Sequence, residues 1–244
     1  MSAGKTAGER TWEQVHRLVE TGLDLLFPPR CASCGIPGSN LCADCRATFE
    51  PLGSCVCDRC AEPLPAPGLC VRCLQHPPCF ERVLSAFLYE GALREAVLAF
   101  KYKGRRGLTS TLADAMAVHV QPDPAQYHAL LAVPMHPERE RERGYNHAAL
   151  LAMELARHWG IPLLPAGALR RARPTDRQVG QDYQARWQNV AGAFIAQGVE
   201  GKSVLVVDDV CTTGATLNAC SEALRAAGAR LTAGATLARA RLHP

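Results

Sequence analysis

The sequence predicts an α/β protein in which a parallel sheet flanked by helices follows a small N-terminal cysteine-rich module. Ten of the twelve cysteines lie between Cys31 and Cys79, in a stretch that is also rich in proline and glycine. Beyond residue 81, short apolar runs alternate with segments of helical periodicity, which is the pattern of a parallel sheet covered by helices. We therefore divide the chain into a helix at 11–29, a cysteine-rich module at 30–80 and an α/β domain at 81–244.

The segment 11–29 is expected to form an amphipathic helix. Its apolar residues recur at three- and four-residue spacing, and Thr11 with Gln14 has the pattern of a capping box. Pro28 and Pro29 then end the helix. The apolar positions are Trp12, Val15, Leu18, Val19, Leu23 and Leu26.

The cysteine-rich module contains four Cys-x-x-Cys turns. Such a turn directs two sulfur atoms towards one metal ion, and zinc takes four thiolates in a tetrahedron. A stretch of this composition cannot bury a core of its own, so we expect two structural zinc ions to fold it. The predicted ligands are Cys31, Cys34, Cys42, Cys45, Cys57, Cys60, Cys70 and Cys73.

The loops between neighbouring turns are short, which makes sequential pairing of the turns the simplest arrangement. A cross-braced arrangement is the alternative. Cys55 and Cys79 fall outside the turns and are interpreted as thiols packed near the sites. The module has few aromatic or basic side chains for nucleic-acid contact, so structural stabilisation or protein docking is favoured over nucleic-acid binding.

Composition restricts the location and the partners of the protein. Apolar residues make up 48% of the chain, yet no run approaches the roughly 18–20 apolar residues of a membrane helix. The first residues also lack the apolar core of a secretory signal, so we expect a cytoplasmic protein, in which clustered cysteines bind metal. The formal charge of +4 falls to about zero once two tetrathiolate zinc sites are included, so overall charge does not favour nucleic acid.

The α/β domain is expected to alternate strands and helices. Apolar runs of strand length lie at 82–89, 130–133, 204–207 and 231–236. Helical patterns lie between them at 92–102, 146–159 and 215–227. The consecutive apolar residues at 204–207 are typical of a parallel strand buried on both faces.

The segment 204–216 carries the most chemical information. Its strand ends in two acids, and Thr-Thr-Gly-Ala-Thr then leads into a helix. In a parallel sheet, ligands bind beyond the carboxyl ends of the strands, and loop amides at a helix N-terminus attract phosphate. Adjacent carboxylates suit two vicinal hydroxyls, with Mg²⁺ close by. The predicted ligand-binding residues are Asp208, Asp209, Thr212, Thr213, Gly214, Ala215 and Thr216.

This segment resembles the thirteen-residue motif of type I phosphoribosyltransferases, which bind 5-phosphoribosyl 1-diphosphate (PRPP) together with Mg²⁺. The resemblance implies a type I phosphoribosyltransferase-like sheet, with both acids on the ribose hydroxyls and the threonine-rich loop on the 5′-phosphate. Since Asp208 and Asp209 are adjacent like charges, we expect that replacing both with asparagine weakens PRPP binding and slightly stabilises the free protein.

Together with the doubled cysteine module, three further segments at 100–106, 133–146 and 171–178 make the chain similar to the competence protein F (ComF) family, from about residue 23 onwards. Segment 133–146 then corresponds to the pyrophosphate loop, and segment 171–178 to a mobile catalytic loop. Relatives of this family are tied to DNA uptake during natural transformation. The resemblance implies catalytic roles for Asp208, Asp209 and Arg143. It selects His136, Arg139, Arg143 and Gly144 in the pyrophosphate loop, and Arg171, Arg173 and Gln178 in the mobile loop.

Several of these residues have a simpler interpretation. The alternating Glu and Arg residues at 138–143 sum to zero charge, so Arg139 and Arg141 equally suit a solvated helix start. Lys101 and Lys103 equally suit surface positions. Neither His136 nor His147 is expected to act as a general base. Cys211, inside the phosphate-binding segment, is expected to fill a small apolar slot.

The predicted function is transfer of a phosphoribosyl group from Mg-PRPP, or binding of a related ribose 5-phosphate. The acceptor is an unidentified base or amine, because no segment predicts a specific nucleobase pocket. The alternative is a non-catalytic competence factor that binds single-stranded DNA or a partner helicase and uses the PRPP site for sensing. A third interpretation, a zinc-ribbon regulator with a vestigial site, is disfavoured by the intact pair of acids.

Overall fold

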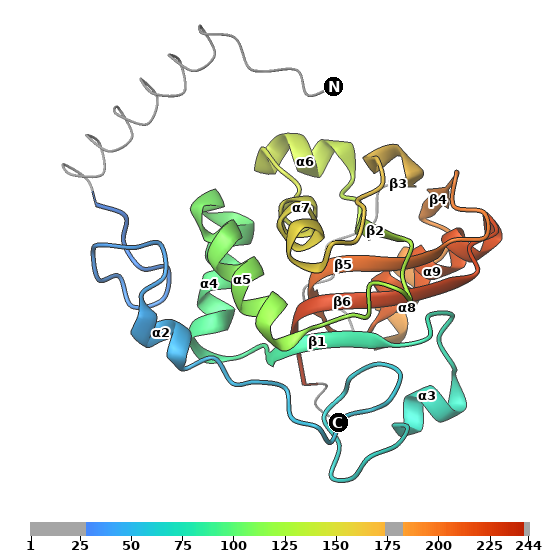
Figure 1. Cartoon of the computed structure of the whole chain (residues 1–244), viewed down its shortest axis with the longest axis horizontal. Coiled ribbons are helices and arrows are strands. Elements are labelled where there is room, and N and C mark those ends of the chain that lie inside the picture. The colour runs from blue at the N-terminus through green and yellow to red at the C-terminus, as the bar shows by residue number, and fades with distance from the viewer. Residues whose placement is uncertain (1–27, 174–182, 242–244) are drawn as a thin grey trace, which may run out of the picture.

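The computed structural model describes residues 28–173 and 183–241. Four parallel strands form the central sheet, in the order β1 (Val83–Leu88), β6 (Leu231–Arg239), β5 (Ser203–Cys211) and β2 (Ala129–Ala132) (Figure 1). The predicted α/β fold with a parallel sheet is thereby confirmed. The helix expected at 11–29 lies outside the described residues, except for its two prolines, and so does Gln178.

Helices cover both faces of this sheet. One layer consists of α4 (Gly91–Tyr102), α5 (Thr109–His119) and α7 (His147–Trp159), whose apolar faces share a core with β5 and β6. The opposite layer contains α8 (Tyr183–Val190) and α9 (Ala215–Ala226), together with an antiparallel pair of strands. That pair consists of β3 (Leu169–Arg171) and β4 (Phe194–Ala196).

The central strand β5 owes its burial to its consecutive apolar residues. Leu205 and Val207 face the α4–α5–α7 layer, whereas Val204 and Val206 face the α9 layer. All four side chains are fully buried, as a parallel strand covered on both faces requires. The ladder with β6 continues past the expected end of the run, to the pair Cys211 and Arg239. The two acids therefore belong to the strand itself.

The cysteine module forms two small metal ribbons with sequential pairing. Each ribbon contains one short helix, α2 (Ala43–Ala47) in the first and α3 (Val71–Gln75) in the second. The thiols of Cys42 and Cys70 cap these helices by accepting hydrogen bonds from the backbone N–H groups of Cys45 and Cys73. The cross-braced alternative does not occur, because each cluster contains only neighbouring turns.

Several described elements were not predicted from the sequence, among them β3, β4 and α5. Arg171, expected in a mobile loop, is the last residue of β3. Strands β3 and β4 have three residues each, which is too short to show a period. Helix α5 was missed because its many small residues weaken the apolar contrast between its faces. Within the described part of the chain, no helix is long and apolar enough to cross a membrane.

Segment 138–143 forms a solvated helix, as the simpler interpretation of its alternating charges predicted. Helix α6 (Pro137–Arg143) begins at a proline and has no buried residue. Two short 3-10 turns, η1 (Arg106–Leu108) and η2 (Ala166–Ala168), complete the set of described elements. Helix α6 follows β2 in the chain and lies at the upper edge of the molecule in Figure 1.

Candidate functional site

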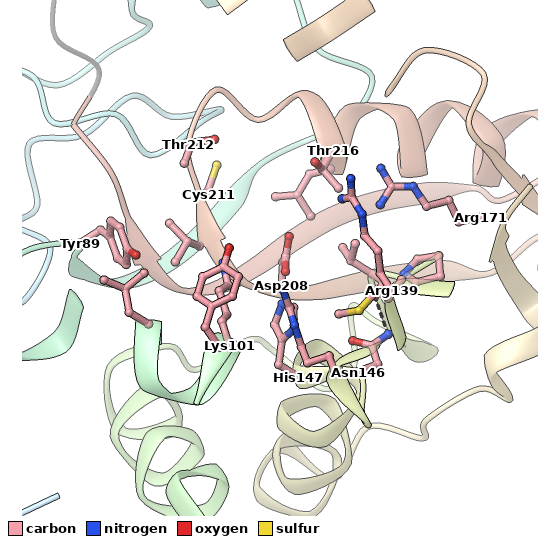
Figure 2. Close-up of a pocket in the computed structure, with 18 of the residues that line it drawn as sticks. Tyr89, Lys101, Arg139, Asn146, His147, Arg171, Asp208, Cys211, Thr212 and Thr216 are labelled. Atoms are coloured by element: carbon pink, nitrogen blue, oxygen red, sulfur yellow. Dashed lines mark hydrogen bonds between the residues drawn. The ribbon is translucent and has the colours of Figure 1, made fainter. Parts of the chain in front are cut away.

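A cavity of about 1210 Å³ lies at the carboxyl ends of the parallel strands. Its walls come from α4, from the segment between β2 and α7, from the end of β3 and from the turn between β5 and α9. Figure 2 shows Tyr89 and Lys101 at one end of this cavity, Arg139 and Arg171 at the other, and Asp208 between them. This is the edge where ligands of parallel sheets bind.

The turn between β5 and α9 has the geometry of an anion site, and we call residues 210–216 the phosphate loop. Gly214 has φ +80°, a left-handed conformation that side chains with a Cβ rarely adopt. A Cβ at this position would also meet Phe80 at 3.5 Å. Thr212 and Thr216 line the cavity, and helix α9 begins at Ala215, so its first N–H groups face the same space.

Thr213 is the one predicted member of the phosphate loop that turns elsewhere. Its Oγ1 accepts a hydrogen bond from the Ala215 N–H at 3.3 Å, which stabilises the start of α9. Its side chain is buried and lines a second cavity of about 620 Å³ on the side of the second zinc ribbon. Thr212, Gly214, Ala215 and Thr216 all line the main cavity.

The two acids have different surroundings. Asp208 is half-buried and lines the main cavity, where burial and the neighbouring Asp209 raise its pKa to about 8. Asp209 is 1% exposed, and its Oδ2 lies 2.8 Å from Nζ of Lys101. Burial alone would raise the pKa of Asp209, but Lys101 and His147 hold it well below its ordinary value. Asp209 therefore stays ionised.

A chain of polar contacts continues from Asp209 to the arginines. Nε2 of His147 lies 3.6 Å from Oδ1 of Asp209, and Nδ1 of His147 lies 2.9 Å from Nη1 of Arg143. A guanidinium group has no acceptor, so Nδ1 accepts and Nε2 carries the hydrogen towards the carboxylate. The Arg143 guanidinium also stacks on the ring of Tyr102, 4.9 Å from its centroid. These contacts orient Arg143 along the cavity wall.

Among the predicted pyrophosphate-loop residues, Arg139 and Arg143 line the cavity. His136 and Gly144 instead shape the two ends of α6. Nδ1 of His136 accepts a hydrogen bond from the Glu138 N–H at 3.4 Å, and Gly144 ends the helix at φ 81°. The Gly144 carbonyl accepts a hydrogen bond from Arg106, whose guanidinium lies 4.6 Å from the Tyr145 ring centroid.

The predicted mobile-loop residues separate in space. Arg171 lines the cavity at the end of β3, and its guanidinium lies 5.4 Å from the Phe194 ring centroid. Burial lowers the pKa of Arg171. Arg173 points to the backbone instead and donates to the Ala191 carbonyl at 2.7 Å. Arg139, Arg143 and Arg171 all line the cavity, and we call these three arginines the basic wall.

Both cysteine clusters have the geometry of a zinc site. In each cluster the four sulfur atoms lie within 4.8 Å of one another. The Cys34–Cys42 and Cys60–Cys70 sulfur pairs are each 3.7 Å apart. Tetrahedral zinc with sulfur at about 2.3 Å requires sulfur–sulfur distances of about 3.8 Å, so both clusters fit this ion.

Two family models match separate parts of the chain. A family model described as a double zinc ribbon domain matches residues 22–74, and one described as a phosphoribosyl transferase domain matches residues 146–242. Competence protein F of Haemophilus influenzae is 30% identical over 217 residues, covering 83% of this chain and 93% of that protein. The chain belongs to the competence protein F family. The double-ribbon match supports structural zinc at both clusters of this family member.

Two other known proteins are also similar to this chain. DNA utilization protein YhgH of Salmonella typhimurium is 29% identical over 84% of this chain and 94% of that protein. A Bacillus subtilis glutamine PRPP amidotransferase structure with ADP and GMP is 24% identical, with a TM-score of 0.40. That similarity covers 57% of this chain and 30% of the larger enzyme.

Several residues in the cavity of this competence protein F family member were not predicted from its sequence. Lys101 equally suits a surface position by sequence, yet its ammonium pairs with Asp209 inside the site. Tyr89 and Arg94 also line the cavity. The basic sequence around Lys101 indicated an anion-binding segment, but it does not show whether Lys101 or Lys103 faces the cavity. The helical periodicity of α4, in which Phe100 is buried, could have indicated which lysine faces inwards.

Proposed function

We propose that this protein binds Mg-PRPP in the main cavity and transfers its phosphoribosyl group to a base or amine acceptor. The observation that carries the proposal is the position of Asp208, which lines the same cavity as the phosphate loop and the basic wall. A ligand with a phosphate, a ribose and a pyrophosphate offers one group to each of these three. A simple ribose 5-phosphate would occupy only part of the cavity.

Each part of the cavity then has a chemical task. Asp208 accepts hydrogen bonds from the ribose hydroxyls, and Asp209 supports it by holding Lys101 and His147 in place. Thr212, Thr216 and the N-terminus of α9 bind the 5′-phosphate. Arg139, Arg143 and Arg171 bind the pyrophosphate and stabilise its charge as it leaves.

The reaction requires positioning more than acid–base chemistry. The bond from C1 of the ribose to the pyrophosphate oxygen breaks while a nitrogen of the acceptor attacks C1, so positive charge develops on the ribose. Mg²⁺, bound with PRPP, would supply charge neutralisation on the pyrophosphate. The described residues orient the donor, and the basic wall lowers the energy of the departing group.

We infer two units for this function, a zinc-ribbon module at 30–80 and a phosphoribosyltransferase-like domain at 81–244, preceded by a helix at 11–29. A role in DNA uptake is supported by the names of the relatives, which are a competence protein and a DNA utilization protein. The same names favour the second candidate function, a non-catalytic factor that binds single-stranded DNA or a partner helicase. In that case PRPP acts as a sensed ligand.

Calorimetry with Mg-PRPP tests the proposed ligand, and incubation with a bacterial metabolite extract tests transfer. We expect heat of binding, release of pyrophosphate and a new ribosylated mass. Asp208→Asn should lose most of the binding, whereas Asp114→Asn, an exposed acid on α5, should bind as the natural protein does. Binding without pyrophosphate release would favour the sensing alternative. Equal binding by both variants would place the ribose elsewhere and contradict the proposal.

A further inference from the structure

Arg239 is a core arginine that the proposed reaction does not use. It is the last residue of β6, and its side chain has no exposed surface. In the sheet it pairs with Cys211 of β5, so it lies beside the start of the phosphate loop. A guanidinium group in the core must find acceptors for its five hydrogens, because an unsatisfied buried charge is strongly destabilising.

The acceptors of Arg239 belong to two different parts of the molecule. Nε donates to the Cys60 carbonyl at 2.9 Å, and Nη2 donates to Glu62 and lies 4.0 Å from the Cys60 sulfur. Nη1 donates to the Cys211 carbonyl at 3.0 Å and also to the Thr212 carbonyl. One side of the guanidinium therefore holds a zinc-binding turn, and the other side holds the phosphate loop.

These contacts fix the direction of the loop amides. In a planar trans peptide the C=O and the following N–H point in opposite directions. The carbonyls of Cys211 and Thr212 point towards Arg239, so the N–H groups of Thr212 and Thr213 point away from it. Loop N–H groups are the donors with which such turns bind phosphate. Together with the Ala240 N–H, which donates to the Cys211 carbonyl at 2.9 Å, Arg239 fixes how these amides are presented.

Two further contacts join the second ribbon to the same loop. The ring of Phe80, which is 1% exposed, lies beneath Gly214. The Cys79 N–H donates to Oδ1 of Asn218, in the first turn of α9, at 2.7 Å. The first ribbon is joined to a different place, since its Arg30 carbonyl accepts a hydrogen bond from Arg105, next to η1.

We propose that Arg239 is a positioning residue that couples zinc at the second ribbon to anion binding at the phosphate loop. Metal held by Cys57, Cys60, Cys70 and Cys73 fixes the Cys60 turn, Arg239 transmits its position, and the loop amides are held ready for phosphate. Zinc at the first ribbon has no such effect. The inference rests on the proposed PRPP site and adds a metal requirement to it.

Such a coupling is reciprocal, because two ligands that favour the same state of the protein raise each other's affinity by the same factor. The full-length protein is equilibrated with buffered zinc, with and without Mg-PRPP. Alkylation of cysteines in peptides 31–45 and 57–73 then reports which ribbon has lost its ion. We expect Mg-PRPP to strengthen zinc binding at the second ribbon by about tenfold and to leave the first unchanged.

The test variant is Arg239→Lys, because it keeps the charge but lacks the planar fork whose separate nitrogens Nε and Nη1 donate to the Cys60 and Cys211 carbonyls. We expect both ribbons of this variant to bind zinc while the effect of Mg-PRPP on the second disappears. The control is Arg230→Lys, just before the other end of the strand, where the arginine side chain donates to Ser203 at 2.8 Å. The control should keep the coupling. An unchanged coupling in Arg239→Lys would overturn the proposal.

A second readout separates this inference from the proposed function. Amide hydrogen exchange of peptides covering 210–216 needs no ligand, so it remains informative if the natural protein binds no Mg-PRPP. Arg239→Lys should raise this exchange by about tenfold, and Arg230→Lys should not. If Arg239→Lys fails to fold, Glu62→Gln replaces it, since this variant keeps the arginine and loses only its charged acceptor. Exchange equal to the natural protein in the folded test variant would contradict the coupling.

Discussion

The two zinc ribbons share their Cys-x-x-Cys turns and their thiol-capped helix, yet they are attached to the α/β domain differently. In the first ribbon Cys34 is exposed, and the core it joins is that of α4, α5 and α7. In the second ribbon Cys57, Cys60 and Cys73 are buried in the core that contains β5 and α9. The same metal-binding motif therefore forms a peripheral cap in one place and the support of the phosphate loop in the other.

The two ribbons should differ most in how the loss of a zinc ligand affects Mg-PRPP binding. We expect Cys60→Ser and Cys34→Ser each to lower the zinc content from about two ions to about one, because a structural site requires its full set of thiolates. Cys60→Ser should also lose most Mg-PRPP binding, whereas Cys34→Ser should retain it. Metal analysis and calorimetry on the same samples measure both effects. Equal loss of Mg-PRPP binding in the two variants would mean that both ribbons support the phosphate loop to the same extent.

A smaller difference is expected for two buried phenylalanines that lie beside the ribbons. Phe80 packs beneath Gly214 on the second-ribbon side, and Phe49 packs on Phe87, with ring centroids 5.4 Å apart, on the first-ribbon side. Replacing either with alanine should lower the free energy of unfolding by about 3–5 kcal/mol, because each leaves a cavity. Only Phe80→Ala should also weaken Mg-PRPP binding at a temperature where both variants are folded. Denaturant unfolding and calorimetry check this pair.

Replacing Asp208 or Asp209 should weaken ligand binding without changing either zinc ribbon. Asp209→Asn leaves Lys101 without its carboxylate partner, so we expect it to lower the free energy of unfolding by about 1–3 kcal/mol. Asp208→Asn should have the opposite sign, because the raised pKa of Asp208 shows that its charge is unfavourable in the folded protein. Both variants should keep both zinc ions, which metal analysis verifies.

The sign of the Asp208 effect depends on pH. Its pKa is about 8 in the folded protein, against an ordinary value of 3.8, so between these values the folded state binds the proton more strongly than the unfolded chain. Stability due to this group therefore falls as pH rises from about 4 to about 8. The stability gain of Asp208→Asn should grow over the same range and level off above it. A gain that shrinks with rising pH in denaturant titrations would refute this assignment.

The smallest effect is expected at Cys211, the second residue of the phosphate loop, whose side chain belongs to the same core cluster as the second ribbon. Its side chain is buried, and burial raises its pKa to about 11, so it stays a neutral thiol in an apolar slot. Cys211→Val should change the free energy of unfolding by less than about 1.5 kcal/mol, since the two side chains have similar volumes. Mg-PRPP affinity should be nearly unchanged, because the Cys211 carbonyl that binds Arg239 is retained. A large loss in calorimetry would assign the thiol a direct role.

Local sequence patterns predicted the parts of the molecule that depend on local chemistry. The spacing of Cys31, Cys34, Cys42 and Cys45 limits which sulfur atoms can share an ion, and sequential pairing is what the clusters show. The apolar run before Asp208 predicted a buried strand, because four consecutive apolar residues suit burial on both faces. The turn after this strand was also predicted from local chemistry, because Gly214 adopts a left-handed conformation that other residues rarely adopt.

Contacts between distant segments could not be predicted in this way. Lys101 and Asp209 are far apart in the chain, and no pattern near either residue indicates that they form an ion pair. That pair changes the expectation for the double Asn variant, because removing both acids also leaves a lysine unpaired in the site. Arg239 was not predicted for the same reason, since its partners Cys60 and Glu62 come from the other end of the chain.

The strand order also constrains the sequence of events in folding. In the described sheet, β1 pairs only with β6, and the register joins Val83 to Gly234. Strand β2 likewise pairs with β5, so apart from single bridges to Pro51 and Leu163 neither early strand has a partner until the last two strands have been synthesised. Pairing across such long separations is slow, because the entropy of closing the loop opposes it. The ligands of both ribbons precede all four strands of the sheet in the chain, so a nascent chain can hold both metals before it has a sheet, and Arg239 joins the second ribbon to the phosphate loop only at the end.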